Sequence, residues 1–183
     1  MIYVALLRGI NVGGNNIINM KQLKQTFEQA GMTSVTTYIN SGNIIFAADY
    51  PQEDLPEILE QAISKDFSLH IKVLIRNLDE ISKVIAALPA SWSNDDKLRS
   101  DVMFLWEEAD DESILGKLPL KPGIGTLLYV PGAVLYSVER ENVIQSAMAK
   151  LIGSTVYKLM TVRNVNTTRK IYQLMLAAEA QRA

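Results

Sequence analysis

The segment RGINVGGNN, residues 8–16, carries the side chains of this chain that are best suited to binding a small anion. It follows an unbroken apolar run at residues 2–7 and combines one guanidinium with three glycines and three asparagines. Backbone N–H groups and an arginine fork are typical of sites that hold a phosphate or a carboxylate. The same residue types also supply left-handed turns, so a purely structural loop is the alternative interpretation.

The known phosphate-binding patterns do not fit this segment. Gly9 and Gly14 match the spacing of the phosphate loop G-x-x-x-x-G-K-[ST], but Asn15 and Asn16 replace its lysine and its magnesium-binding hydroxyl. The dinucleotide pattern G-x-G-x-x-G fails at its first spacing. The segment therefore favours a ligand loop without naming a reaction, and it leaves the catalytic residues, the cofactor and the question of an enzyme open.

Composition excludes several classes of site. The chain has no cysteine and one histidine, His70, which removes thiol catalysis, disulfides and Cys/His zinc sites, and no metal site is predicted. A net charge of -2 at pH 7 supplies no general attraction to nucleic acid or anionic lipid. The N-terminal apolar run is broken by Arg8, which argues against a signal peptide or a membrane span. We expect a cytoplasmic protein.

Hydrophobic periodicity predicts the order βαββαβ in the first half of the chain. An apolar run at 2–7 indicates a buried strand, and a helix capped by Asn19 follows and ends at Gly31. VTTYINSGNIIFAA indicates two strands around an Asn-Ser-Gly-Asn turn. A second helix near 55–63, a strand at 71–76 and a helix capped by Asn77 and Glu80 complete the half. This is the order of the ferredoxin-like fold.

The second half repeats this order of elements. A strand at DVMFLW, a helical segment near 112–118, a hairpin turning at Pro131 and Gly132, a helix from about 142 to 151 and a strand near TVYKLMTV are predicted. A last helix carries Ile171, Leu174 and Met175. The fold class predicted is therefore α+β: two tandem ferredoxin-like halves with antiparallel sheets, residues 1–88 and 98–183, joined by a polar connector. No residue-level repeat is visible in the sequence.

The strand order of a ferredoxin-like sheet, 4-1-3-2, predicts which loops meet. Strand 1 ends at the edge where strands 2 and 3 are joined, so RGINVGGNN should lie beside NSGN. We call the shared edge the Arg8 rim, and its predicted members are Arg8, Asn11, Asn15, Asn16, Asn40, Ser41 and Asn43. The first helix begins there with the positive end of its dipole. Because strand 1 is apolar on both faces, we expect each sheet to be covered on both sides, by the other sheet or by a second chain in a homodimer.

The C-terminal segment TVRNVNTTRK, residues 161–170, is a second candidate. Arg163 and Asn164 precede the last helix, whose first N–H donors lie near Thr167. A helix cap beside two solvated cations is the alternative interpretation. The candidate ligand-binding residues are therefore Arg8, Asn11, Gly13, Gly14, Ser41, Asn43, Arg163, Asn164 and Thr167.

Three motifs, RGINVGG, TYINSGNIIF and TVRNVNT, resemble the signatures of an uncharacterised bacterial family, domain of unknown function 1697. The resemblance spans nearly the whole chain, and it implies no established activity. It implies that the following residues occupy family motif positions: Arg8, Gly9, Asn11, Gly13, Gly14, Ser41, Gly42, Asn43, Arg163, Asn164 and Thr167. The chain departs from the family pattern at Asn40, where glutamine is expected, and at Val165, where tryptophan is expected, which puts an aromatic stacking role at position 165 in doubt.

Two hypotheses of function follow. The first is a protein that binds a small phosphorylated or carboxylated ligand at the Arg8 rim. The second is a nucleic-acid or protein interaction module whose motifs are architectural. Nucleic acid is not favoured as a partner, because Asn43 and Ile45 stand where the stacking aromatics of an RNA-binding sheet belong.

Overall fold

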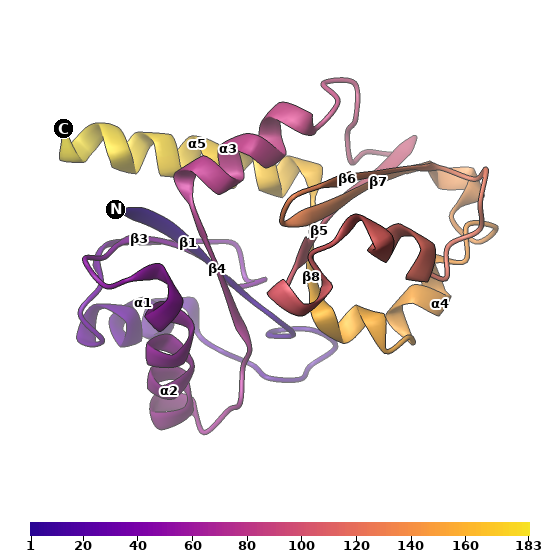
Figure 1. The fold of residues 1–183 in the computed structure, drawn as a ribbon. Coiled ribbons are helices and arrows are strands. Elements are labelled where there is room, and N and C mark those ends of the chain that lie inside the picture. The colour runs from indigo at the N-terminus through magenta and orange to yellow at the C-terminus, as the bar shows by residue number, and fades with distance from the viewer. The chain divides into compact units, whose positions relative to one another are not determined.

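The computed structural model describes all residues, 1–183, as a mixed α+β protein with two four-stranded antiparallel sheets (Figure 1). Its contacts divide the chain into two compact units. The first unit comprises residues 1–81 and 171–183, and the second unit comprises residues 82–170. The boundaries between the units fall inside two helices, α3 (Leu78–Ala87) and α5 (Val165–Arg182).

The sheet of the first unit has the strand order predicted from the sequence. Its strands are β1 (Ile2–Leu7), β2 (Thr33–Tyr38), β3 (Asn43–Ala47) and β4 (Val73–Asn77), and they lie in the order β2-β3-β1-β4. Helices α1 (Met20–Gln29) and α2 (Leu55–Phe67) connect the strands, and a short 3-10 helix, Gln52–Asp54, precedes α2. All pairings are antiparallel. The end of β1 therefore lies beside the turn between β2 and β3.

Strand β1 is buried on both faces, as its unbroken apolar run predicts. Tyr3, Ala5 and Leu7 belong to a core cluster that includes Phe27 of α1 and Leu59 of α2. The side chains on the opposite face are no more than 1% exposed. Full burial of each such aliphatic side chain contributes about 1.5–3 kcal/mol. The position of β1 is thus strongly determined, and so is the position at which Arg8 leaves the sheet.

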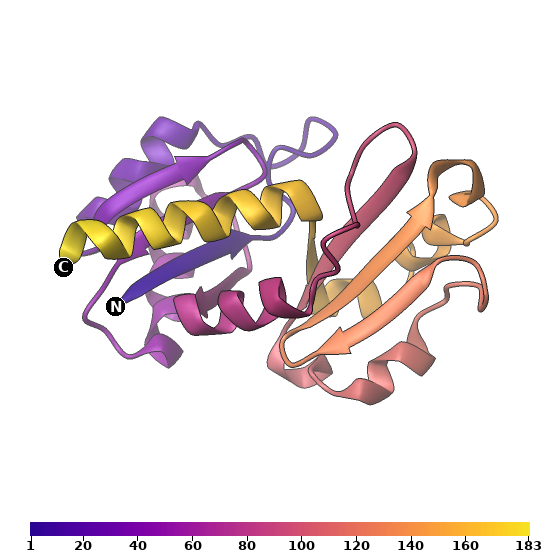
Figure 2. The same ribbon diagram turned by 90° about the horizontal axis from the view of Figure 1, so that it is seen from above.

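The C-terminal part of α5 belongs to the first unit, whereas the sequence placed residues 171–183 with the second half. Figures 1 and 2 show this part of α5 along the face of the first sheet that lies opposite α1 and α2. Ile171 and Met175, one helical turn apart, are buried on it. The physical reason is that a strand with two apolar faces needs a cover on each face.

The second unit has a sheet with the same topology. Its strands are β5 (Leu98–Leu105), β6 (Thr126–Val130), β7 (Ala133–Glu139) and β8 (Met160–Asn164), in the order β6-β7-β5-β8. The predicted hairpin turn at Pro131 and Gly132 joins β6 to β7. The connections contain one short helix, α4 (Met148–Ile152), and the 3-10 helices Glu107–Ala109, Glu112–Lys117, Arg140–Asn142 and Val156–Leu159.

The prediction of a helix from about 142 to 151 is wrong for most of this range. Only α4, which begins at Met148, is α-helical, and the preceding Ala147 is left-handed with a φ of 63°. A left-handed non-glycine residue interrupts the ladder of i to i−4 hydrogen bonds that a longer helix needs. Ile144, which the periodicity assigned to the helix, is 94% exposed.

The two units repeat one another in their backbone hydrogen bonds. Leu7 N donates to Gly42 O at 2.9 Å, and Leu105 N donates to Gly132 O at 2.9 Å. At the next position along each strand, Arg8 N donates to Lys72 O and Trp106 N donates to Leu159 O, both at 3.0 Å. The end of β1 in the first unit and the end of β5 in the second unit are therefore equivalent positions. Arg8 corresponds to Trp106, so the arginine is a feature of the first unit alone.

An Arg-Asn pair is also repeated, although no residue-level repeat was visible in the sequence. Arg76 and Asn77 end β4 and precede α3, and Arg163 and Asn164 end β8 and precede α5. Arg76 Nη1 donates to Ile75 O at 3.0 Å, and Arg163 Nη1 donates to Val162 O at 2.9 Å. Each asparagine caps its helix by accepting, on its Oδ1, a backbone N–H three residues ahead, from Glu80 and from Thr167.

Candidate functional site

The loop after β1 is a small β-hairpin with a glycine turn. Val12 and Asn15 form a β-bridge, and Asn15 N donates to Val12 O at 2.9 Å. The two residues between them, Gly13 and Gly14, both have positive φ, 56° and 78°. Positive φ at both central positions is the signature of the type I′ turn, which favours glycine. These two glycines are exposed, and an added Cβ at either would meet nothing within 4 Å.

Asn11 links this hairpin to its surroundings through three hydrogen bonds. Its Oδ1 accepts the backbone N–H of Ile18 at 2.8 Å, and its Nδ2 donates to Ile18 O at 3.2 Å. The same Nδ2 donates to Asn40 O at 2.8 Å, which joins the loop after β1 to the β2–β3 turn. The structure thus brings the two predicted loops together, and the hydrogen bonds of the Asn11 side chain hold them in place.

The β2–β3 turn is closed by Asn43. This residue is fully buried, and its Nδ2 donates to Tyr38 O at 3.0 Å and to Ser41 Oγ at 2.9 Å. Ile39 in the same turn has a φ of 48°, a conformation that a β-branched side chain rarely adopts. Such backbone strain gathers at functional sites more often than elsewhere. Asn43 and Ser41 are therefore structural partners of one another inside a strained turn.

The N-terminus of α1 lies at the same edge, but its first donors are occupied. Asn19 Oδ1 accepts the backbone N–H groups of Lys21 at 3.0 Å and Gln22 at 3.1 Å. This confirms Asn19 as the predicted cap. An anion at the Arg8 rim would therefore be attracted by the helix dipole rather than bound by these N–H groups.

Arg8 has a cationic neighbour that the sequence interpretation missed. Arg8 N donates to Lys72 O at 3.0 Å, so the two residues lie side by side at the ends of β1 and β4. Arg8 is half-buried and Lys72 is exposed. The strand order itself would have indicated Lys72, because strand 4 begins next to the end of strand 1.

The three segments that meet at this edge, residues 8–19, 39–43 and 68–72, contain no aspartate or glutamate. A carboxylate of α2, Glu60, approaches from beneath, and its Oε1 accepts the N–H of Val73 at 3.0 Å. Two adjacent cations are thus set among amides, glycines and hydroxyls. Such a surface attracts anions.

The candidate residues Arg163, Asn164 and Thr167 lie in the second unit. Arg163 is 7% exposed, and its Nη1 donates to Thr161 Oγ1 at 2.9 Å as well as to Val162 O. Burial lowers the pKa of Arg163 to about 10, although Tyr157 acts in the opposite direction. The N–H of Thr167 donates to Asn164 Oδ1, so these two residues form a helix cap. A ligand role for this segment stays a prediction.

Two further properties of the molecule bear on its class. No group of three or more His, Cys, Asp or Glu side chains is placed so that it could hold a metal ion. None of the helices combines the length and the apolar character that a membrane span requires.

Comparison with known proteins gives a family and no activity. The chain is 30% identical to a conserved bacterial protein from Streptococcus pneumoniae of known structure. The two folds superpose with a TM-score of 0.81, over 95% of this chain and 98% of the other. No curated protein sequence matches the chain. The model of a family described as protein of unknown function (DUF1697) matches residues 1–136, which include the first two of the three motifs. The chain therefore belongs to this family, as its motifs predicted.

Proposed function

We propose that the first unit binds a small anionic ligand, phosphorylated or carboxylated, at the Arg8 rim. The observation that carries the proposal is the pairing of Arg8 with Lys72 on an edge whose three segments contain no carboxylate. A guanidinium and an ammonium act in complementary ways, since arginine binds two oxygens at a fixed geometry and lysine acts as a mobile point charge.

The asparagines of the Arg8 rim have a different role in this proposal. Asn11 and Asn43 are engaged with backbone groups of the loop after β1 and of the β2–β3 turn, as described above. They hold the loops in place, and Arg8 and Lys72 provide the charge. Each unit is proposed to be a ferredoxin-like fold, in which a loop beside the central strand is a position that a ligand can reach. A cytoplasmic location stays a prediction.

A calorimetric and thermal-shift titration tests the proposal. The ligands are inorganic phosphate, pyrophosphate, a hexose phosphate, a nucleoside monophosphate and citrate, each at low ionic strength because salt screens exposed charges. A ligand present at about 100 times its dissociation constant should stabilise the protein by about 2.7 kcal/mol. Arg8→Gln and Lys72→Gln should each weaken binding, and Lys97→Gln, at an exposed lysine of the second unit, should leave it unchanged.

Each variant is compared with its own unliganded melting temperature, so a change in stability is not mistaken for a change in binding. Lys72→Gln alters an exposed side chain and keeps the test informative if Arg8→Gln fails to fold. The proposal is wrong if none of the five anions binds, or if binding is equal in wild type, Arg8→Gln and Lys72→Gln.

A second candidate is an interaction module, which one observation favours. Val12 is 63% exposed, Ile17 is 74% exposed and Ile39 is 48% exposed, and all three belong to the two loops that Asn11 joins. Exposed apolar side chains that lie together occur where a protein contacts a macromolecule. Retardation of single-stranded or double-stranded nucleic acid on a gel at low salt, lost in Ile17→Ser, supports this candidate. Absence of retardation removes its nucleic-acid version.

A further inference from the structure

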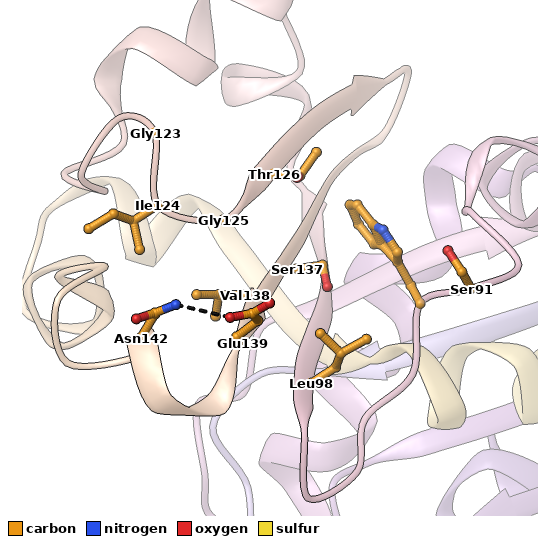
Figure 3. A pocket seen from close by; sticks show the side chains of 11 residues that line it. Ser91, Leu98, Gly123, Ile124, Gly125, Thr126, Ser137, Val138, Glu139 and Asn142 are labelled. Atoms are coloured by element: carbon orange, nitrogen blue, oxygen red, sulfur yellow. Dashed lines mark hydrogen bonds between the residues drawn. The ribbon is translucent and has the colours of Figure 1, made fainter.

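The second unit contains a pocket with a volume of about 620 Å³, lined by residues of β5, β6 and β7, of the connector before β5 and of the Gly123–Gly125 loop (Figure 3). This volume falls within the range of about 300–1,000 Å³ that small-molecule sites occupy. In Figure 3, Thr126 and Ser137 lie between Ser91 on one side and the Gly123–Gly125 loop on the other. The pocket is separate from the Arg8 rim, since every lining residue belongs to residues 82–170.

Two hydroxyl residues on neighbouring strands, Thr126 and Ser137, line the pocket, and the fully buried Ser100 lies behind Ser137. Thr126 of β6 pairs with Ser137 of β7, and Ser137 pairs with Ser100 of β5. Ser100 Oγ and Ser137 Oγ share one hydrogen bond of 2.7 Å. A hydroxyl group has one donor and two acceptor positions, so Ser137 keeps hydrogen-bonding capacity toward the pocket. Glu139, two residues along β7, points to the same face about 7 Å further on.

Trp92 lines the pocket from the connector before β5, and its backbone is fixed. Arg169 Nη1 donates to Trp92 O at 2.6 Å, and Arg169 Nη2 donates to Pro89 O at 3.0 Å. Both carbonyls are thus held by one planar guanidinium. A large aromatic side chain on a fixed backbone provides a flat binding surface at little entropic cost.

The Gly123–Gly125 loop forms another wall by packing tightly on β7. Gly125 has a φ of 83°, and a Cβ at this position would lie 2.8 Å from Ser137 O and 2.8 Å from the Tyr136 ring. Only glycine allows this approach. The wall therefore presents backbone groups close to Ser137.

The charge of the pocket selects against anions. Glu139 is the one lining side chain that carries a charge at neutral pH, and its Oε2 accepts a hydrogen bond from Asn142 Nδ2 at 3.2 Å. A phosphate or carboxylate would meet a like charge with no lining cation to balance it. These groups fit a neutral ligand with several hydroxyl groups and one apolar face. Its hydroxyls would donate hydrogen bonds to the Glu139 carboxylate and both donate to and accept from the hydroxyls of Thr126 and Ser137. Its apolar face would lie against the Trp92 indole.

We infer that this pocket binds a neutral polyhydroxylated ring, of the class of mono- and disaccharides, with Trp92 against the ring face and Thr126, Ser137 and Glu139 on its hydroxyls. The site is independent of the Arg8 rim in residues and in ligand charge. A protein with both sites would recognise two different small molecules.

The experiment is saturation-transfer NMR, with calorimetry for affinity, on the full chain. The panel contains neutral hexoses, N-acetylhexosamines, pentoses and disaccharides at millimolar concentration, with nucleosides and alkylamines as competing classes. A sugar should bind, and transfer should be strongest on the ring protons that face the indole. Thr126→Val should weaken binding about three- to tenfold, the usual value of one hydrogen bond. Trp92→Leu should weaken it at least about tenfold.

Two matched variants serve as controls. Trp106→Phe changes the other tryptophan, and Thr155→Val removes an exposed threonine hydroxyl that does not line the pocket. Both should bind the sugar with unchanged affinity. Thr126→Val alters an exposed residue and is expected to fold if Trp92→Leu does not. The inference is overturned if no sugar binds, if only nucleosides or amines bind, or if Trp92→Leu and Thr126→Val both bind with wild-type affinity.

Discussion

The side-chain amide of Asn11 donates to the backbone carbonyl of Asn40 at 2.8 Å, so the loop after β1 and the β2–β3 turn are held as one unit. The two residues are 29 positions apart in the sequence. Asn11 itself has a left-handed φ of 53°, a conformation that asparagine tolerates better than most residues. Both its side chain and its backbone therefore suit this position.

Substitution of Asn11 tests this link. Asn11→Ala removes all three side-chain hydrogen bonds and should lower the free energy of unfolding by about 1–3 kcal/mol. Asn11→Asp keeps the acceptor for Ile18 N and loses the donor to Asn40. In amide hydrogen exchange, Ile18 should exchange faster in Asn11→Ala and remain protected in Asn11→Asp. Asn15→Ala, at an exposed position of the same hairpin, should change stability by less than about 0.5 kcal/mol. Equal effects of Asn11→Ala and Asn15→Ala would contradict the role of Asn11.

Alanine substitutions at Gly13 and Gly42 distinguish the effect of backbone strain on stability from the effect of overpacking. Gly42 and Gly13 both have positive φ, 85° and 56°. A Cβ at Gly42 would lie 2.7 Å from Leu7 Cβ and 2.9 Å from Ile10 Cδ1, whereas a Cβ at Gly13 would meet nothing within 4 Å. Gly13→Ala should therefore cost about 1–2 kcal/mol for the left-handed conformation alone. Gly42→Ala should cost about 1–3 kcal/mol more, because it also overpacks the core. Urea unfolding measures both, and a smaller loss for Gly42→Ala than for Gly13→Ala would show that the turn relaxes.

The sequence predicted the first unit well because its signals are local and agree with one another. An apolar run, the Asn19 cap and the Asn77–Glu80 capping box each determine one element, and Asn77 N and Glu80 Oε2 do form the reciprocal bond at 2.8 Å. Once the element order was assigned, the strand order followed from a common topology. The meeting of Arg8 with the β2–β3 turn was thus predictable without any long-range information.

The second unit was less predictable, because its connections are irregular. Residues between β5 and β6 form 3-10 helices rather than an α-helix, and Ala147 interrupts the helix expected before β8. The assignment of α5 to the first unit depends on which apolar face needs a cover, which periodicity alone does not state. The pocket beside Trp92 was not predicted, since its residues come from three strands, two loops and a 3-10 helix with no common motif.

Arg163 and Arg76 occupy equivalent positions and differ in burial. Arg163 is 7% exposed, and Arg76 is half-buried. Lysine cannot reproduce the arginine fork, so Arg163→Lys leaves Thr161 Oγ1 or Val162 O without its donor. We expect a loss of about 1–3 kcal/mol for Arg163→Lys. Arg76→Lys should lower the free energy of unfolding by less, since water can replace the lost donor at a half-buried site. Thermal unfolding compares the two, and an equal or larger loss in Arg76→Lys would show that burial does not decide the effect.

Asp95 should stabilise the folded protein near neutral pH, and this contribution should be lost in acid. Its Oδ1 accepts the N–H groups of Leu98 and Lys97, both at 2.8 Å, and its Oδ2 accepts the Ser93 hydroxyl at 2.7 Å. These bonds, that of Leu98 first, lower the pKa of Asp95 to about 2 from 3.8. A carboxyl whose pKa is lower in the folded state contributes stability above its unfolded pKa and loses it as the pH falls through its folded pKa. The contribution of Asp95 should therefore be complete above about pH 5 and disappear as the pH approaches about 2.

Asp95→Asn isolates this contribution. The wild type should be more stable than Asp95→Asn near neutral pH, and the difference should shrink in acid, as measured by urea unfolding at a series of pH values. A carboxyl carbon NMR titration should show Asp95 still ionised where an ordinary aspartate is half protonated. Asp96→Asn, at the exposed neighbouring carboxyl, controls for the change in net charge. Because the Asp95 turn leads directly from Trp92 into β5, Asp95→Asn should also loosen the connector at the pocket beside Trp92. A difference between wild type and Asp95→Asn that is independent of pH would refute the role assigned to the ionised carboxylate.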